Sequence, residues 1–223
     1  MRKFFVVLLC VFLLAPCVKA GGGEKYVALT FDDGPSGRFT RRLLDGLEDR
    51  DAKATFFLCG YRVKDYGKEA RRIAEEGHEI AIHGYSHDSM CPMSAEEVTG
   101  EIRATAELLP EECHPLFLRP PGGSCGDGVT TAAAKDGLFV LNWSLDSKDW
   151  ATRDVQTIVN NVVKKVRDGD VILMHDMSDS SVTAALRIID ILSSRGYSFV
   201  TVTELARIKG ATLTPGRVYE RFD

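Results

Sequence analysis

Apolar and polar positions along the chain follow two periods. Short runs rich in Val, Ile, Leu and Phe have the length and composition of buried strands. Longer stretches, in which apolar residues recur every three to four positions, have the period of an amphipathic helix. The pattern predicts seven strands, at 26–31, 54–58, 79–82, 116–118, 138–142, 171–174 and 198–202.

Helical stretches separate most of these strands. Regular alternation of strand and helix predicts an α/β fold with a parallel sheet. The pattern alone allows either a small irregular barrel or a doubly wound sheet, and in both the functional residues gather at the carboxyl ends of the strands. No internal repeat divides the chain, so we expect one domain at 26–208 and a C-terminal tail at 209–223. The helices are expected at 40–50, 64–77, 94–109, 155–169 and 181–196.

The first twenty residues have the layout of a secretory signal peptide. Arg2 and Lys3 precede an apolar run that reaches Pro16, and the small residue Ala20 ends the segment. The run is shorter than the roughly 20 residues that a membrane-spanning helix prefers. We therefore expect cleavage near Ala20, a flexible segment at 21–25 and a secreted protein with no stable membrane span. Anchoring by an uncleaved N-terminal segment is the alternative.

Charge and cysteine content narrow the functional classes. Three of the 28 Lys and Arg lie in the signal segment and none of the 32 Asp and Glu does, so the mature net charge is −7. This balance gives no electrostatic reason to expect nucleic acid or an anionic membrane as a partner. Outside the cytosol, the four remaining cysteines are expected to form one or two disulfides or to stay as buried thiols. They are Cys59, Cys91, Cys113 and Cys125.

Two adjacent aspartates stand at the end of the first predicted strand, in "TFDDGP". Side chains on a strand alternate between its two faces, so neighbouring carboxylates there do not normally serve one site. Asp, Gly and Pro are also turn residues, which makes a solvated turn the simpler interpretation. The alternative is that the chain leaves the strand here, so that Asp32 and Asp33 take different roles in one site.

The segment "HGYSH" follows the third predicted strand and has His83 and His87 four positions apart. This spacing puts two side chains on one helical face, where they can share a metal ion. Two unrelated polar residues at a helix start are the simpler interpretation of the pair alone. A carboxylate from Asp33 would complete three ligands and leave positions open for water and substrate.

The segment "FLRPPGGSCG" combines a buried cation with a glycine pair. Arg119 ends a buried strand and therefore needs an anionic partner, for which Asp32 is the natural candidate. Gly122 and Gly123 permit close approach of backbone N–H groups to a ligand. Without Arg119, a rigid loop would be the preferred interpretation.

Two later segments add aromatic and ionisable groups. "LNWSLDSKDW" contains Asp146, Asp149 and both tryptophans of the chain, Trp143 and Trp150. An acid-rich loop is usually solvated, but two tryptophans so close together favour a lined pocket, and aromatic faces suit sugar rings. His175 ends a strand in "DVILMHD". A lone histidine there is more often structural, but other ionisable groups at strand ends favour a catalytic role.

Together these segments resemble the ordered motifs of the polysaccharide deacetylase family (the NodB-homology domain, carbohydrate esterase family four). The matching segments are "TFDDGP", "HGYSH", "RPPGG", "DSKDW" and "LMH", and the resemblance runs from about residue 26 to 205. It implies a single-domain distorted (β/α) barrel and metal-dependent removal of acetyl groups. Gly84 stands where the family more usually has Ser or Thr. Gly122 replaces a frequent tyrosine, so the ring contact is lost and the backbone N–H remains.

The resemblance implies a metal site and a base. Asp33, His83 and His87 would hold Zn²⁺ or another divalent cation such as Co²⁺. The cation would polarise the acetyl carbonyl and lower the pKa of a bound water. Asp32, held by Arg119, would take the proton of that water as it attacks the amide carbon.

The remaining residues would stabilise the oxyanion, protonate the leaving amine and hold the acetyl methyl group. The backbone N–H of Gly122 would help to stabilise the oxyanion. His175, oriented by Asp149, would protonate the departing amine. Leu173 and Trp150 would line a pocket for the acetyl methyl group.

An extracellular polysaccharide of N-acetylated sugars is the expected substrate, and a monomer is expected. For a bacterial protein, peptidoglycan is the first candidate and chitin oligomers are the second. Cleavage of an O-acetyl ester, as in acetylxylan-active relatives, is an alternative that the motifs leave open. A non-catalytic carbohydrate-binding protein would not need the complete set of ionisable residues. A structural or interaction protein would leave the order of the five motifs unexplained.

Overall fold

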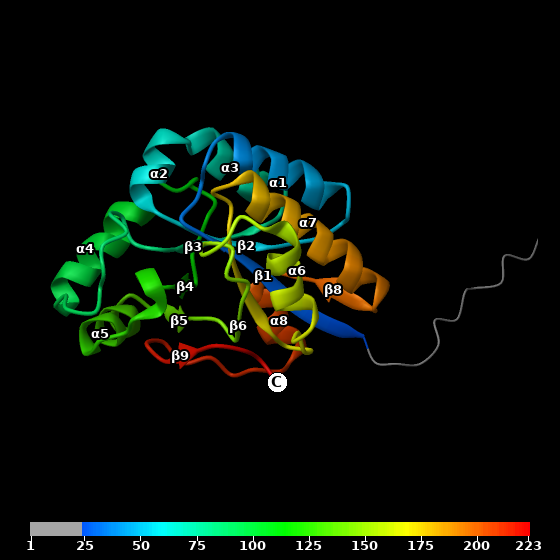
Figure 1. The fold of residues 1–223 in the computed structure, drawn as a ribbon. Coiled ribbons are helices and arrows are strands. Elements are labelled where there is room, and N and C mark those ends of the chain that lie inside the picture. Colours follow the sequence, from blue (N-terminus) through cyan, green and yellow to red (C-terminus); the bar gives the residue numbers. More distant parts are fainter. Residues whose placement is uncertain (1–23) are drawn as a thin grey trace, which may run out of the picture.

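Strand β1, Lys25–Asp32, lies inside a parallel sheet that forms the centre of the protein (Figure 1). The structure is a computed structural model that describes residues 24–223. β1 is buried from Val27 onward. Because the strand lies inside the protein, its residues from Val27 to Asp32 do not alternate between buried and exposed positions. It pairs with β7, Val171–His175, on one side and with β2, Thr55–Leu58, on the other.

The strand order is β6-β7-β1-β2-β3-β4-β5-β9, and β8 pairs with the beginning of β1. All of these pairs are parallel. The consecutive order from β1 to β5 has no reversal point, which favours a barrel over a doubly wound sheet. A bridge between Asp170 and Arg221 brings the segment after β9 against the start of β7, so the curled sheet nearly closes. The other strands are β3 Glu79–Ile82, β4 Phe117–Leu118, β5 Phe139–Leu141, β6 Leu145–Asp146, β8 Tyr197–Phe199 and β9 Val218–Tyr219.

All seven predicted strands are present, with two more that the pattern missed. β6 and β9 are two residues long, and an apolar period cannot be recognised over two positions. The last predicted strand is too long, because β8 ends at Phe199 and a helix begins at Val202. β9 lies in the segment expected as a tail and pairs with β5, and Phe222 after it is buried.

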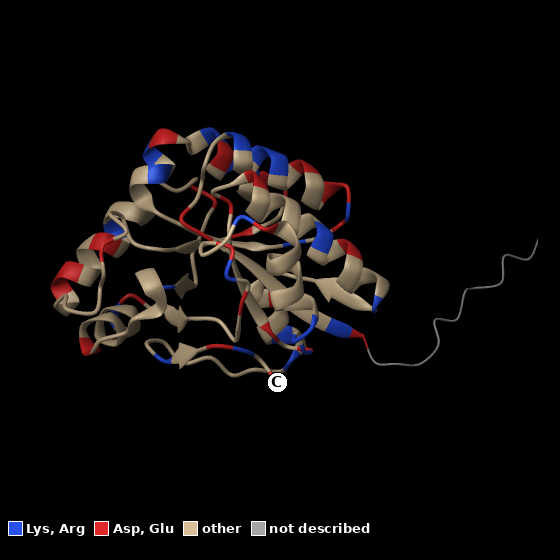
Figure 2. Ribbon diagram, viewed as in Figure 1, with Lys and Arg blue, Asp and Glu red and all other residues tan. Residues whose placement is uncertain are grey.

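Helices surround the sheet, and Lys, Arg, Asp and Glu lie mostly on their outward faces (Figure 2). The five predicted helical stretches are helical, but 64–77 is divided at Tyr66 into parts of two helices. Helices α5 and α8 were not predicted from the sequence; they have nine and seven residues. The helices are α1 Arg38–Glu48, α2 Gly60–Asp65, α3 Gly67–Glu75, α4 Ala95–Ala106, α5 Asp127–Lys135, α6 Val155–Val163, α7 Asp179–Ser194 and α8 Val202–Ile208, with a 3₁₀ turn at Pro121–Gly123.

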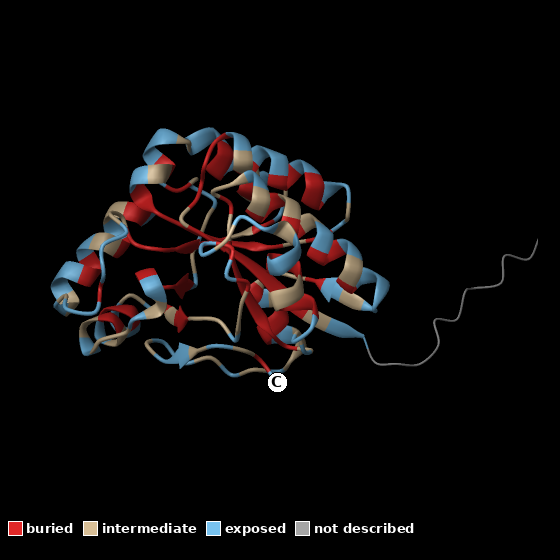
Figure 3. Ribbon diagram, in the orientation of Figure 1, coloured by how far each residue is buried: buried red, intermediate tan, exposed pale blue. Residues whose placement is uncertain are grey.

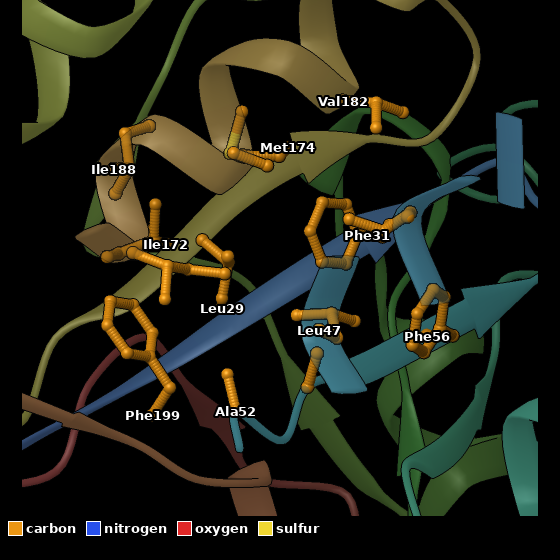
Figure 4. Packing of buried hydrophobic residues seen from close by; sticks show 14 of the residues in the cluster. Leu29, Phe31, Leu47, Ala52, Phe56, Ile172, Met174, Val182, Ile188 and Phe199 are labelled. Carbon is orange, nitrogen blue, oxygen red and sulfur yellow. The ribbon is translucent and has the colours of Figure 1, made fainter. Parts of the chain in front are cut away.

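The main core fills the space between the sheet and helices α1 and α7. Buried residues follow the strands and the inward faces of the helices (Figure 3). Phe31 of β1 stacks on Phe56 of β2 with ring centroids 5.3 Å apart, and Leu29 and Ile172 belong to the same cluster (Figure 4). Burying each such side chain contributes about 1.5–3 kcal/mol. This packing fixes the carboxyl ends of β1 and β7, where the candidate residues begin.

The predicted signal segment 1–20 lies outside the described residues, as do residues 21–23. Lys25, which was expected to end a flexible segment, already belongs to β1. None of the helices in residues 24–223 has both the length and the apolar character that a membrane crossing requires.

The four cysteines of residues 24–223 are unpaired, and only Cys59 is fully buried. The expectation of disulfides is therefore not met in this structure.

Candidate metal and catalytic site

Asp32 and Asp33 separate where β1 ends. Asp32 is the last residue of the strand, in register with His175 of β7. Asp33 has a φ of 71°, a left-handed conformation that Asp tolerates better than most residues. The strand alternation therefore stops between the two residues, and both carboxylates face one pocket.

The two histidines meet through a loop and not through a helix. His83 directly follows β3, and α4 begins only at Ala95. Gly84 and His87 have φ values of 81° and 65°, which turn the chain back on itself. The ring centroids of the histidines are 5.2 Å apart. The prediction that both lie on one helical face is wrong, although the rings do come together.

The side chains of Asp33, His83 and His87 converge as a set of metal ligands. Asp33 Oδ1 lies 3.4 Å from His83 Nε2 and 3.0 Å from His87 Nε2. One ligand atom from each residue lies within 4.8 Å of the others. Asp33 Oδ1 is buried and accepts no hydrogen bond from the described residues, as expected of an oxygen that faces a cation. Two imidazoles and one carboxylate are a donor set that suits zinc.

Electrostatics and tautomer both support this use of the three residues. His83 Nδ1 lies 2.7 Å from the carbonyl oxygen of Arg119. Because a carbonyl only accepts, Nδ1 carries the proton and the lone pair of Nε2 faces Asp33. Burial raises the pKa of Asp33, but the adjacent His83 and His87 outweigh it and hold that pKa well below its usual range. Asp33 is therefore ionised, as a ligand must be.

Arg119 forms a buried ion pair with Asp32. Both side chains are almost completely inaccessible, and Arg119 Nη1 donates to Asp32 Oδ1 at 2.6 Å. The guanidinium also donates to Thr30 Oγ1 and to the carbonyl oxygens of Leu141 and Asn142, at 2.7–2.9 Å. The pairing expected from the sequence is present. Breaking a buried pair of this kind costs about 3–5 kcal/mol.

His175, at the end of β7, is held twice by Asp149. Asp149 Oδ1 lies 2.8 Å from His175 Nδ1, and Asp149 Oδ2 accepts from the backbone N–H of His175 at 2.9 Å. Burial lowers the pKa of His175, but the hydrogen bond and charge of Asp149 outweigh it and raise that pKa to about 9. Asp146 contacts Lys148 and Trp150 instead. Asp149 is thus the carboxylate that orients this histidine.

These groups share a cavity of about 300 Å³. Nine of the eleven residues predicted for the site line it. Arg119 and Asp149 stand behind the lining, in contact with Asp32 and His175. A Cβ on Gly122 would meet no atom within 4 Å, so space remains where the family often has a tyrosine. The lining residues are Asp32, Asp33, His83, His87, Gly122, Trp143, Asp146, Lys148, Trp150, Leu173 and His175.

Two residues near the site carried no assigned role in the sequence analysis. Lys148 has a φ of 60°, and its Nζ lies 2.8 Å from Asp146 Oδ2. No feature of the sequence marks this lysine. Asp176 directly follows His175 and is fully buried. Its place at the end of the segment "DVILMHD" is the sequence signal that could have identified it as part of the site.

Asp176 braces the turn that carries Asp33. The hydroxyl of Thr40 donates to Asp176 Oδ2, and the hydroxyl of Ser36 donates to the Asp176 carbonyl oxygen. A Cβ on Gly34 would lie 2.6 Å from Asp176 Oδ1, so only glycine fits between Asp33 and Pro35. Burial raises the pKa of Asp176 to about 6.

Comparison with known proteins places this site in a family. Residues 19–141 match the family model of polysaccharide deacetylases. The peptidoglycan-N-acetylglucosamine deacetylase of Bacillus cereus is 38% identical, over 83% of this chain and 90% of that protein. The chitooligosaccharide deacetylase of Rhizobium leguminosarum bv. trifolii is 33% identical, over 82% of this chain and 93% of that protein.

A solved structure agrees with this assignment. The family 4 acetyl xylan esterase of Clostridium thermocellum, in complex with a cobalt ion, superposes with a TM-score of 0.81 at 35% identity. The match covers 88% of this chain and 98% of that one. The predicted distorted (β/α) barrel is therefore confirmed. The chain belongs to the polysaccharide deacetylase family and is a metal-dependent hydrolase of that family.

Proposed function

We propose that the protein removes N-acetyl groups from peptidoglycan, outside the cytoplasm and as a monomer, with Zn²⁺ as its cation. The observation that carries the proposal is one cavity that joins a metal-ligand set to two further ionisable groups, Asp32 and His175. The similarity to a peptidoglycan deacetylase supports this substrate.

Asp32 is the proposed base. Asp33, His83 and His87 would hold a divalent cation, which when bound would polarise the acetyl carbonyl and lower the pKa of water. Because Arg119 occupies Asp32 Oδ1, Oδ2 is the oxygen left to accept a proton from the attacking water. Asp32 Oδ2 lies 3.7 Å from His83 Nε2, beside the ligand set.

His175 is the proposed acid. Its Nδ1 faces Asp149, which leaves Nε2 to donate a proton to the departing amine. With a pKa of about 9, His175 carries that proton at neutral pH. The backbone N–H of Gly122 supports the oxyanion, as other preorganised donors do.

The apolar lining is proposed to hold the sugar and its acetyl group. Leu173 and Trp150 would contact the methyl group, and Trp143 would provide a further aromatic wall. Trp150 is 58% exposed, which leaves much of its indole available for contact with a sugar ring.

Acetate release from three polymers tests the proposal. Purified full-length protein with Zn²⁺ is incubated with peptidoglycan, chitin oligomers and acetylxylan, with the Asp32→Asn variant as a matched control. We expect fastest release from peptidoglycan and little release by the variant. Preferred release from acetylxylan would support the second candidate, an O-acetyl esterase like the similar solved structure. No release from any of the three would contradict both.

A further inference from the structure

The loop that carries both histidines is held by a side chain from the next helix. This histidine loop, residues 83–88, is the first part of the connection between β3 and α4. Glu101 of α4 points Oε2 into it. That oxygen accepts from the backbone N–H groups of Tyr85 and Ser86 at 2.7 and 2.9 Å, and from Ser86 Oγ at 3.2 Å. We propose that Glu101 is a positioning residue, which holds the histidine loop in the conformation that binds the metal.

The loop is fixed from two sides. On one side, its N–H groups donate to Glu101. On the other side, the carbonyl oxygens of Gly84 and Tyr85 accept from the N–H groups of Gly60 and Tyr61, at 2.9 and 3.1 Å. Gly60 and Tyr61 begin helix α2. Consecutive N–H groups that point at one place form an anion-binding concavity, and here the anion is a carboxylate of the chain itself. Glu101 is thus the partner that satisfies the two consecutive N–H groups of the loop.

This bridge bears on the geometry of His87. His87 has a φ of 65°, a conformation that non-glycine residues keep only where their surroundings impose it. Ser86, directly before it, donates to Glu101, and its Oγ also accepts from the N–H of Asp88 at 3.2 Å. The residues on both sides of His87 are therefore tied to the Glu101 bridge. Removal of the Glu101 side chain would release the segment that holds the His87 ring against Asp33.

Gly84 explains why the bridge comes from a helix. At a φ of 81°, a Cβ on Gly84 would lie 2.6 Å from Met90 Cε and 3.2 Å from Glu101 Oε2. At this positive φ, any side chain at the position, where Ser or Thr is more usual in the family, would be strained. Gly84 has no side-chain oxygen of its own, and the acceptor for the loop's N–H groups comes from α4.

Helix α4 is a rigid support for that oxygen. Ser94 and Glu97 form a reciprocal capping box at its first turn. Thr105 Oγ1, one turn after Glu101, would lie 2.8 Å from a Cβ on Gly60, so α4 packs closely on the start of α2. A group held on a packed helix keeps its position better than one on a loop.

The inference rests on the metal site of the proposed function, and metal affinity tests it without measuring activity. The dissociation constant for Zn²⁺ is measured by chelator competition on the metal-free full chain, for the unchanged protein, Glu101→Ala, Glu101→Gln and Glu96→Ala. Glu96 is an exposed glutamate on the same helix, so its loss is a matched control for charge. Unfolding of each metal-free protein is recorded in parallel.

We expect Glu101→Ala to weaken Zn²⁺ binding about 10- to 100-fold, which is the usual effect of removing an outer-shell partner of a metal ligand. Glu101→Gln keeps an acceptor oxygen and should stay closer to the unchanged protein than to Glu101→Ala. Glu96→Ala should bind normally. If Glu101→Ala does not fold, Ser86→Ala removes one of the three donors to Glu101 and should weaken Zn²⁺ binding by a smaller factor than the one expected for Glu101→Ala. An unchanged dissociation constant in Ser86→Ala would then overturn the inference.

Three outcomes would overturn the inference. The first is a folded Glu101→Ala protein that binds Zn²⁺ within about twofold of the unchanged chain, far from the loss typical of an outer-shell partner. The second is an equal loss in Glu101→Ala and Glu101→Gln, which would assign the effect to charge alone. The third is equal weakening by Glu96→Ala. An unchanged protein that binds no divalent cation would instead contradict the proposed function.

Discussion

Asp32 and Asp33 are adjacent in the sequence, yet their carboxylates have different partners. Asp32 is paired with a guanidinium that also binds three neutral oxygens, so the surroundings already compensate its charge. Asp33 faces two imidazole nitrogens and has a buried oxygen without a hydrogen bond. This difference is the reason for assigning them different roles.

Replacing Asp32 by Asn should separate catalysis from metal binding. The variant loses the proton acceptor and keeps all three proposed ligands, so turnover should fall about 100- to 10,000-fold while Zn²⁺ stays bound. Metal content and acetate release are measured on the same sample. Asp33→Asn is the matched variant and should lose the metal. Retention of metal by Asp33→Asn and its loss from Asp32→Asn would reverse the two roles.

The His175–Asp149 pair predicts an alkaline limb in the pH profile. The pKa of His175 is raised to about 9, so the imidazolium is present at neutral pH and is lost as the pH rises through that value. Activity should therefore fall on the alkaline side. In Asp149→Asn the neutral amide no longer favours the cation, and the limb should move to lower pH, toward the ordinary value of about 6.5. An unchanged limb in Asp149→Asn would mean that another group protonates the amine.

At the scale of elements, the sequence pattern predicts the long segments well and the short ones poorly. The strands that end in Asp32 and His175, and the strand directly before His83, are long enough for their apolar character to be recognised. The histidine loop was interpreted as helical because its histidines are four residues apart. The same spacing also brings two side chains together where residues with positive φ reverse the chain. The partner of Asp32 could be inferred, since a buried guanidinium needs an anion. The Glu101 bridge could not, because it depends on which face of α4 meets the loop.

The turn after β1 should be sensitive to one added methyl group. In Gly34→Ala, the new Cβ would lie 2.6 Å from Asp176 Oδ1, and overpacking of this kind costs about 1–3 kcal/mol. The free energy of unfolding is measured with urea on the metal-free protein. Gly100→Ala is the control, because its Cβ would meet no atom within 4 Å on an exposed part of α4. That variant should gain about 0.5–1 kcal/mol. Equal stability of the two variants would contradict the close fit at Gly34.

At the scale of the whole molecule, the barrel brings distant segments to one end. Strands β1 and β3 belong to one central sheet (Figure 1), and β7 pairs with β1 in the same sheet. Residues at or directly after the ends of all three strands line the cavity. The order of the motifs in the sequence was sufficient to predict the family and this convergence. The short strands β6 and β9, which extend the sheet toward closure, became visible only in the structure.

Metal removal and restoration test the central claim most directly, namely that Asp33, His83 and His87 hold the cation on which deacetylation depends. Acetate release from peptidoglycan is measured on the chelated protein during titration with Zn²⁺, together with bound metal, for the unchanged chain and His83→Ala. We predict that release is lost on chelation and returns in proportion to about one bound ion per chain, and that His83→Ala binds metal weakly and stays nearly inactive. Full turnover by the metal-free protein, or full metal occupancy with unchanged turnover in His83→Ala, would contradict the account.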